Sequence, residues 1–200
     1  MSNAQKPSEP LRVLLVCTGN ICRSPLAEQV LRQQFAKMGV ESQVEISSAG
    51  TMALKGHPLQ EKSAESMTEL GYAPTEHRAR QLTAEMLEEA DLVLSATSEH
   101  RSEVAKTLIS ANKRSFTIPE FARIATFIAS NPESLSELEP ATTMQAKVQL
   151  AARFRGYAPP AKSSEDIDDP WGLAYEQYQA AAKQITEHAQ AITNWLGGQS

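Results

Sequence analysis

The sequence lacks the features that mark membrane and secreted proteins. No apolar run approaches the ~18 residues that a membrane-spanning helix needs, and the polar N-terminus does not resemble a signal peptide. There are only two cysteines, Cys17 and Cys22, too close together to form a disulfide scaffold. A reducing compartment is the default for such a chain. We therefore expect a cytoplasmic protein with no membrane partner.

An excess of positive charge and a cluster of metal-ligating side chains are also missing. The formal net charge is −5, and the basic residues are scattered along the chain. Binding to a nucleic-acid backbone needs a concentrated basic face, so nucleic acid is not expected as a partner. The four histidines lack the spacing of metal ligands. We expect no metal site.

The most informative stretch predicts a strand, a tight loop and a helix. The apolar run 13–16 is typical of a buried strand, and it stops at Cys17. A turn containing Gly and Asn follows. Ser24 and Pro25 then provide helix-start signals, a capping hydroxyl and a first-turn proline. Apolar residues continue at helical spacing to about Met38, before a glycine that would end the helix.

This arrangement predicts an anion site with a nucleophile. Backbone N–H groups of a tight loop that opens a helix point inward, and the helix dipole adds to their field. Arg23 provides a planar fork that suits two oxygens of a tetrahedral oxyanion. The same field favours the thiolate form of Cys17. The loop is therefore expected to bind a phosphate and to attack its phosphorus with sulfur.

The string Cys-Thr-Gly-Asn-Ile-Cys-Arg-Ser-Pro, at residues 17–25, resembles the signature loop of the low-molecular-weight protein tyrosine phosphatases of the bacterial type. The resemblance implies hydrolysis of phosphotyrosine or another aryl phosphate monoester through a phosphocysteine, without metal or organic cofactor. Cys17 would be the nucleophile, and Ser24 would donate a hydrogen bond to its thiolate. The phosphate-binding residues implied in this way are Thr18, Gly19, Asn20, Ile21, Cys22, Arg23 and Ser24.

A second string, residues 77–83, resembles the family segment in which a histidine precedes Ala-Arg. The resemblance places His77 against Asn20 as a structural support and not as a base. The alternative interpretation is an exposed histidine in a polar turn.

A third motif follows from the chemistry. An aryl alkoxide leaves more easily when a positioned acid protonates it, and the resemblance assigns this role to Asp169, which precedes Pro170. Proline restricts the residue before it to an extended conformation, which helps to hold the carboxyl group. Trp171 would contact the substrate ring. Two departures from the family pattern are Trp171-Gly172 in place of two tyrosines, and Ala96-Thr97 in place of Met-Asp.

Strands that alternate with helices indicate an α/β fold. We expect a three-layer, Rossmann-like structure in which helices flank a four-stranded parallel sheet, as the resemblance to phosphotyrosine phosphatases also implies. The predicted organisation is a disordered tail over residues 1–10 and a single phosphatase domain over 11–198. An extended helical connection around 119–165 would be a lid, an interaction surface or decoration. The resemblance covers about residues 11–118 and 166–197.

The expected partner is a phosphotyrosine-containing protein or a small aryl phosphate, and the sequence favours no oligomeric state. Cys22 is predicted to form a reversible disulfide with Cys17 under peroxide. Two alternatives stay open. One is an arsenate reductase of the same fold, although such enzymes relay oxidation through further cysteines. The other is a catalytically weak regulator that binds phosphate or phosphoproteins.

Overall fold

Four short parallel strands form the centre of the molecule. The computed structural model describes residues 9–135, 141–161 and 164–198. Its sheet has the strand order β2-β1-β3-β4, and every pairing is parallel. This confirms the predicted four-stranded parallel sheet. The strands are β1 (Leu11–Cys17), β2 (Val44–Gly50), β3 (Leu92–Ser95) and β4 (Ser115–Thr117).

The register of the sheet brings the carboxyl ends of the strands to one edge. Cys17, the last residue of β1, pairs with Gly50, the last residue of β2. On the other side Val16 pairs with Ser95 of β3, which in turn pairs with Thr117 of β4. The loops that leave this edge therefore meet in space, as ligand-binding loops do in open α/β sheets.

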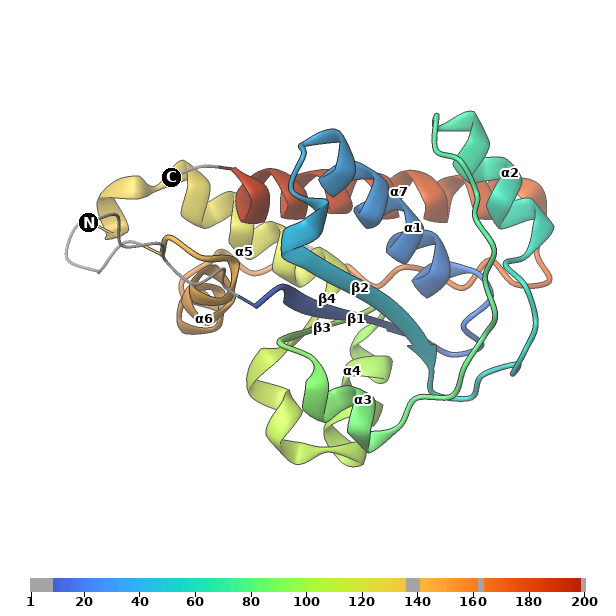
Figure 1. The fold of residues 1–200 in the computed structure, drawn as a ribbon, viewed down its shortest axis with the longest axis horizontal. Coiled ribbons are helices and arrows are strands. Elements are labelled where there is room, and N and C mark those ends of the chain that lie inside the picture. The colour runs from blue at the N-terminus through green and yellow to red at the C-terminus, as the bar shows by residue number, and fades with distance from the viewer. Residues whose placement is uncertain (1–8, 136–140, 162–163, 199–200) are drawn as a thin grey trace, which may run out of the picture.

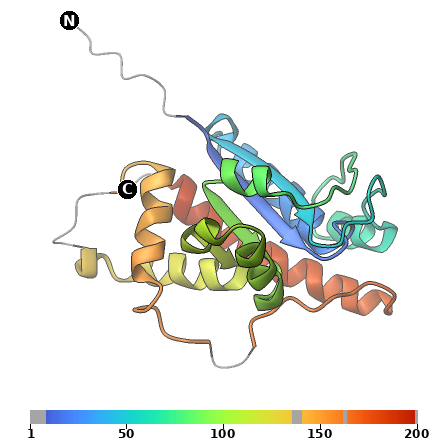
Figure 2. The ribbon, with the colours of Figure 1, turned by 90° about the horizontal axis from the view of Figure 1, so that it is seen from below.

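Two layers of helices cover the sheet (Figures 1 and 2). Because side chains alternate along a strand, Val13 and Leu15 belong to one apolar cluster while Leu14 and Val16 belong to another. The first cluster includes side chains of α1, α5 and α7, and the second packs against α3 and α4. The bounds are α1 (Arg23–Lys37), α2 (Glu61–Glu69), α3 (Ala84–Glu89), α4 (Ser98–Thr107), α5 (Ile118–Ser130), α6 (Met144–Phe154) and α7 (Tyr175–Gly197).

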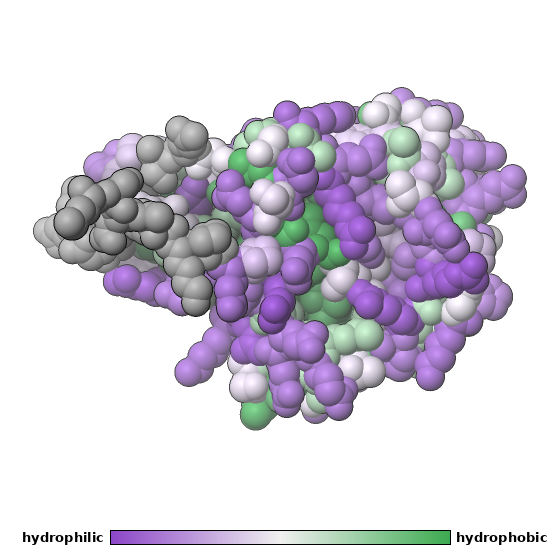
Figure 3. Space-filling view, in the orientation of Figure 1, coloured by the Kyte–Doolittle hydropathy of each residue, from purple (hydrophilic) through white to green (hydrophobic). Residues whose placement is uncertain are grey.

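The described residues also form short 3₁₀ helices, η1 (Glu41–Gln43), η2 (Ile109–Arg114) and η3 (Pro132–Leu135). The surface seen in Figure 3 is mostly hydrophilic, with smaller hydrophobic areas. The long helix α7 shows why, because its apolar stripe from Tyr178 to Leu196 is buried while its remaining positions are largely polar.

One helix-start prediction is wrong in its detail. Helix α1 begins at Arg23, its N-cap residue is Cys22, and no side chain caps it. Ser24 lies inside the first turn, where its hydroxyl contacts Cys17 and Asn20 instead. Pro25 does occupy a first-turn position. The end of the helix agrees with prediction, since Gly39 follows it with φ of 71°, a conformation that favours glycine.

The connection around 119–165 forms α5, η3 and α6 in its described parts. Helix α6 packs on α5, η2 and α7. Figure 1 shows it at the end of the sheet opposite the carboxyl ends of the strands. This position does not suit α6 to act as a lid over a site at those carboxyl ends.

The predicted disordered tail falls mainly on residues 1–8, which lie outside the described residues. Within the described ranges, no helix combines the length and the apolar character needed to cross a membrane. The same part of the chain contains no group of three His, Cys, Asp or Glu side chains that could hold a metal ion.

Candidate active site

The segment after β2 fixes the loop between β1 and α1 by donating hydrogen bonds to the carbonyl groups of the loop. The backbone N–H groups of residues 51, 52, 54 and 60 donate to the carbonyl oxygens of residues 17, 18, 19 and 21 at 2.8–3.0 Å. Among the described residues, none accepts a hydrogen bond from the N–H groups of residues 18–22. Gly50 allows the close approach, because a Cβ there would lie 2.4 Å from the carbonyl oxygen of Thr18. The loop thus keeps its donors free for an anion.

Asn20 fixes the shape of this loop. Its φ of 56° lies in the left-handed region, which asparagine tolerates better than most residues. Its buried side chain accepts a hydrogen bond from the N–H of Arg80 at 2.9 Å and donates to Ser24 and Ser48 at 2.9 and 2.8 Å. The structure places His77 against Asn20, with Nε2 2.7 Å from the main-chain oxygen of the asparagine.

A hydrogen-bonded chain leads from this asparagine to the sulfur of Cys17. The Sγ atom lies 3.0 Å from the Ser24 hydroxyl, and Cys17 is 2% exposed. At the other end, the Ser48 hydroxyl donates to Glu28 at 2.6 Å. Because the Asn20 amide donates to Ser24, the serine hydroxyl hydrogen is free to point at the sulfur. The Ser24 hydroxyl can therefore donate a hydrogen bond to the Cys17 sulfur.

Arg23, the last residue of the loop motif, is buried with part of its hydrogen-bonding capacity unused. One terminal nitrogen donates to the Ile167 carbonyl at 2.9 Å, and the other donates to the Asp169 carboxylate at 2.6 Å. Its Nε is buried and has no partner among the described residues. A buried N–H without a partner is costly, so an oxyanion bound to the Nε side of the guanidinium would remove that cost.

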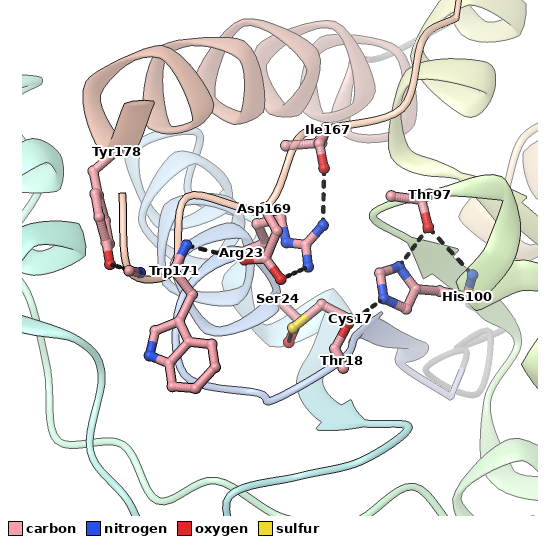
Figure 4. Close-up of polar contacts among 11 residues, drawn as sticks. Cys17, Thr18, Arg23, Ser24, Thr97, His100, Ile167, Asp169, Trp171 and Tyr178 are labelled. Carbon is pink, nitrogen blue, oxygen red and sulfur yellow. Dashed lines mark hydrogen bonds and ion pairs between the residues drawn. The ribbon is translucent and has the colours of Figure 1, made fainter. Parts of the chain in front are cut away.

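The segment that carries Asp169 is tied down on both sides. Upstream, the Ile167 N–H donates to the Ala96 carbonyl at 3.0 Å. Downstream, the Asp169 carboxylate accepts from the Trp171 N–H at 3.2 Å, and the Gly172 N–H donates to the Tyr178 hydroxyl at 3.3 Å. The carboxyl group stays half exposed, facing the Cys17 loop (Figure 4).

A cavity of about 230 Å³ joins these groups. Cys17, Arg23 and Asp169 line it together with Trp171, which is 59% exposed. Its remaining wall includes apolar side chains from the Cys17 loop and from the segment after β2, namely Ile21, Met52 and Leu54. The fold therefore brings residues that the sequence analysis singled out around one cavity, although Cys17 and Trp171 lie 154 positions apart in the chain.

Cys22 also lines the cavity, but its environment differs from that of Cys17. Burial raises the pKa of the Cys22 thiol to about 12, although a hydrogen bond with Ser63 opposes the shift. Cys22 therefore stays a neutral thiol near neutral pH. Of the two cysteines in the loop, Cys17 is the one placed for nucleophilic attack.

Two residues beside the loop, His100 and Thr97, were given no role by the sequence, which marked Thr97 only as a departure from the family pattern. The His100 Nε2 lies 2.8 Å from the Thr18 hydroxyl oxygen, and its Nδ1 lies 2.7 Å from that of Thr97 (Figure 4). The available signal was their position directly after β3, because residues that follow parallel strands reach the ligand edge of the sheet. His100 was instead counted among scattered histidines.

Comparisons with known proteins agree with this geometry. The profile of the low molecular weight phosphotyrosine protein phosphatases matches residues 12–126. The chain belongs to this family. A curated relative, low molecular weight protein-tyrosine phosphatase A of Mycobacterium tuberculosis, is 44% identical over 94 residues, which are 46% of this chain and 56% of that protein. The match thus spans little more than half the length of that relative.

Two solved structures resemble the chain over nearly all of its length. A low molecular weight protein tyrosine phosphatase from T. tengcongensis is 28% identical, with a TM-score of 0.66 over 92% of this chain and 98% of its own. The YwlE arginine phosphatase from Geobacillus stearothermophilus is 26% identical, with a TM-score of 0.67 over 94% of each chain. The family fold therefore continues through the C-terminal segment that carries Asp169.

Proposed function

We propose that this family member hydrolyses phosphotyrosine or related aryl phosphate monoesters through a phosphocysteine intermediate. The observation that carries the proposal is the convergence of Cys17, Arg23 and Asp169 on one cavity, beside a loop whose N–H groups are free to bind an anion. Family membership and a relative named as a protein-tyrosine phosphatase support it further.

In the first step the Cys17 thiolate attacks phosphorus, and the bond from phosphorus to the aryl oxygen breaks. The loop N–H groups and the Arg23 guanidinium stabilise the charge on the three equatorial oxygens. Asp169 transfers its proton to the leaving aryl oxygen, so that a neutral phenol departs. To receive the phosphate, Arg23 exchanges its contact with Asp169 for contacts with phosphate oxygens.

In the second step water attacks the phosphocysteine. Asp169, now a carboxylate, accepts a proton from that water, and the bond between sulfur and phosphorus breaks to release inorganic phosphate. The Ser24 hydroxyl, 3.0 Å from the sulfur, donates a hydrogen bond to the departing thiolate. No metal or organic cofactor is needed to balance either step.

The wall of the cavity supports an aryl substrate. Ile21, Met52 and Leu54 present apolar surface, and the exposed Trp171 ring can stack on a phenyl group. The presence of an arginine phosphatase among the structural neighbours makes phosphoarginine the second candidate substrate. A guanidinium leaving group needs several polar partners. Among the described residues that line this cavity, Asp169 alone provides a carboxylate, which favours the aryl substrate.

The other two alternatives have less support. Nothing in the comparisons favours an arsenate reductase, and the chain has no cysteine beyond Cys17 and Cys22 to relay oxidation. A regulator that only binds phosphate would require neither a nucleophile beneath the anion nor an acid 2.6 Å from its arginine.

The test is hydrolysis of phenyl phosphate and nitrophenyl phosphate at mildly acidic pH without metal. We expect Cys17→Ser to abolish turnover and Asp169→Asn to lower kcat about 10²–10⁴-fold for phenyl phosphate. Asp168→Asn is the matched control, since this neighbouring carboxylate is exposed and does not line the cavity. A folded, reduced wild type without turnover would contradict the proposal, as would full activity of Cys17→Ser.

A competition between matched phosphotyrosine and phosphoarginine peptides decides between the two substrate classes. We expect kcat/KM to favour phosphotyrosine because of the apolar wall. A preference for phosphoarginine would replace the aryl proposal with the second candidate. Arsenate consumption with a thiol reductant, measured in parallel, would move the assignment to the reductase.

A further inference from the structure

His100 joins the phosphate loop to the start of α4. It lies in the first turn of that helix, is 6% exposed, and has its imidazole ring between the hydroxyl groups of Thr97 and Thr18 (Figure 4). Thr18 is the loop residue directly after Cys17 and also lines the cavity. Thr97 stands at one of the two positions after β3 where the chain departs from the family pattern.

One assignment of the protons connects Thr97, His100 and Thr18 into a single chain of hydrogen bonds. The Thr97 hydroxyl oxygen caps α4 by accepting the His100 backbone N–H at 3.3 Å, and it also lies 2.7 Å from the His100 Nδ1. All three groups are satisfied if the Thr97 hydroxyl donates to Nδ1. The imidazole then carries its hydrogen on Nε2 and donates it to the Thr18 hydroxyl oxygen, 2.8 Å away.

This arrangement leaves the hydroxyl hydrogen of Thr18 free. Within the described part of the chain, the Thr18 hydroxyl has no hydrogen-bond partner other than the His100 ring. The hydroxyl lies beside Cys17 on the wall of the cavity (Figure 4), so its hydrogen can point to an oxygen of a bound anion. A donor in this place adds to the N–H groups of the loop.

The environment keeps the imidazole neutral. Burial, together with the Arg23 guanidinium, lowers the pKa of His100 to about 4, against the opposing effect of nearby carboxylates. Two of those carboxylates, Asp169 and Asp166, lie on the segment that carries the candidate acid (residues 166–172, the acid segment). The third is Glu103 on α4. A charged imidazole would offer a hydrogen on both nitrogens and could no longer accept from Thr97.

We propose that His100 is a positioning residue of the phosphate loop, which orients the Thr18 hydroxyl so that it donates to an oxygen of the bound phosphate. The inference rests on the proposed function for the nature of the anion. In this proposal His100 and Thr18 together strengthen binding of the phosphate group. Their effect is the same for every phosphate ester that the enzyme takes.

The experiment measures the dissociation constant of inorganic phosphate by calorimetry, which requires no turnover. Thr18→Val removes the hydroxyl and keeps the side-chain size, and His100→Leu removes both ring nitrogens. His100→Gln restores an N–H near the place of Nε2. The matched control is His57→Gln, a change at an exposed histidine that does not line the cavity.

We expect Thr18→Val and His100→Leu each to weaken phosphate binding about tenfold. Because both remove the same hydrogen bond, the double variant should also be about tenfold weaker. His100→Gln should stay within about threefold of wild type. NMR of labelled histidine should show one imidazole that carries its hydrogen on Nε2 and does not titrate between pH 5 and 8.

Three outcomes would overturn the inference. They are wild-type phosphate affinity in Thr18→Val, a weakening of about a hundredfold in the double variant, and a His100 hydrogen on Nδ1. Thr18→Val keeps the test decisive even if His100→Leu fails to fold. A wild type that binds phosphate without hydrolysing aryl phosphates would refute the proposed function, whereas the binding measurements would still decide the role of His100.

Discussion

Cys17 and Cys22 occupy one loop, yet the structure gives them different chemistry. Cys17 has the Ser24 hydroxyl beside its sulfur, whereas burial raises the pKa of Cys22 to about 12. A neutral thiol does not compete as a nucleophile, but it can resolve an oxidised Cys17. The sequence-based prediction of a disulfide between them remains a prediction that oxidation chemistry can test.

With one equivalent of peroxide, we expect Cys17 to become a sulfenic acid while the peroxide is reduced to water. The Cys22 sulfur then attacks that of Cys17, forms the disulfide and expels a second water. Because the attacking species is the Cys22 thiolate, closure should accelerate with rising pH. Mass spectrometry of the product checks this. With two or more equivalents of peroxide, Cys17 of the Cys22→Ser variant should proceed to the sulfinic acid, because each oxidation step consumes one peroxide. A wild type that becomes over-oxidised at Cys17 without forming the bridge would contradict the prediction.

His100 should make folding stability depend on pH. Its folded-state pKa of about 4 lies below the unfolded value of about 6.5. Between these values the unfolded chain binds a proton that the folded protein does not bind, so stability falls as the pH drops from about 6.5 to about 4. The loss reaches about 3 kcal/mol in the limit. Urea unfolding at pH 7 and pH 4 measures it, and His100→Gln should lose less stability than wild type over the same range.

At the scale of elements, the site depends on how the acid segment is attached to α4. Both oxygens of Asp166 accept from Ser98, one from its N–H at 2.8 Å and the other from its hydroxyl at 2.9 Å. A carboxylate at the N-terminus of a helix is stabilised by the free N–H groups and the helix dipole. Since Ile167 follows directly and donates to Ala96, these contacts set the position of Asp169.

Loss of the Asp166 contact should impair proton transfer to the leaving group. For Asp166→Ala we expect kcat to fall about tenfold with phenyl phosphate and only about twofold with nitrophenyl phosphate, which needs less help from an acid. Asp168→Ala, a change at an exposed neighbour, is the matched control. An equal decrease with both substrates would show that Asp166 does not act through the acid.

At the scale of the whole molecule, α6 contributes to stability away from the site. Lys147 of α6 is 8% exposed, and its ammonium donates to the carbonyl oxygens of Trp195, Leu196 and Gly198 at 3.0, 3.3 and 2.7 Å. These carbonyls at the end of α7 have no partner within their own helix. One side chain thus connects the two helices.

We expect Lys147→Met to lower the free energy of unfolding by about 1–3 kcal/mol, because buried carbonyl groups lose a charged donor. The KM for aryl phosphates should stay within twofold of wild type, since α6 lies far from the carboxyl ends of the strands. Urea unfolding and steady-state kinetics measure both effects. Lys183→Met changes an exposed lysine and should leave stability nearly unchanged. A large change in KM would instead connect α6 to the site.

The sequence by itself determined the strand, loop and helix around Cys17, the parallel sheet and the candidate acid. These follow from local patterns: an apolar run, an unusual nine-residue string, and a carboxylate before proline. It misassigned Ser24 as a helix cap, because the local pattern does not show that Asn20 and Cys17 occupy its hydroxyl.

Only the tertiary structure decided which distant residues meet at the loop. His100 approaches Thr18 across 82 positions, and Asp169 approaches Arg23 across 146. Parallel strands bring their carboxyl ends to one edge, so residues from separate loops become neighbours without any signal in local spacing. Burial, which raises the pKa of Cys22 and lowers that of His100, is likewise a property of the packed chain.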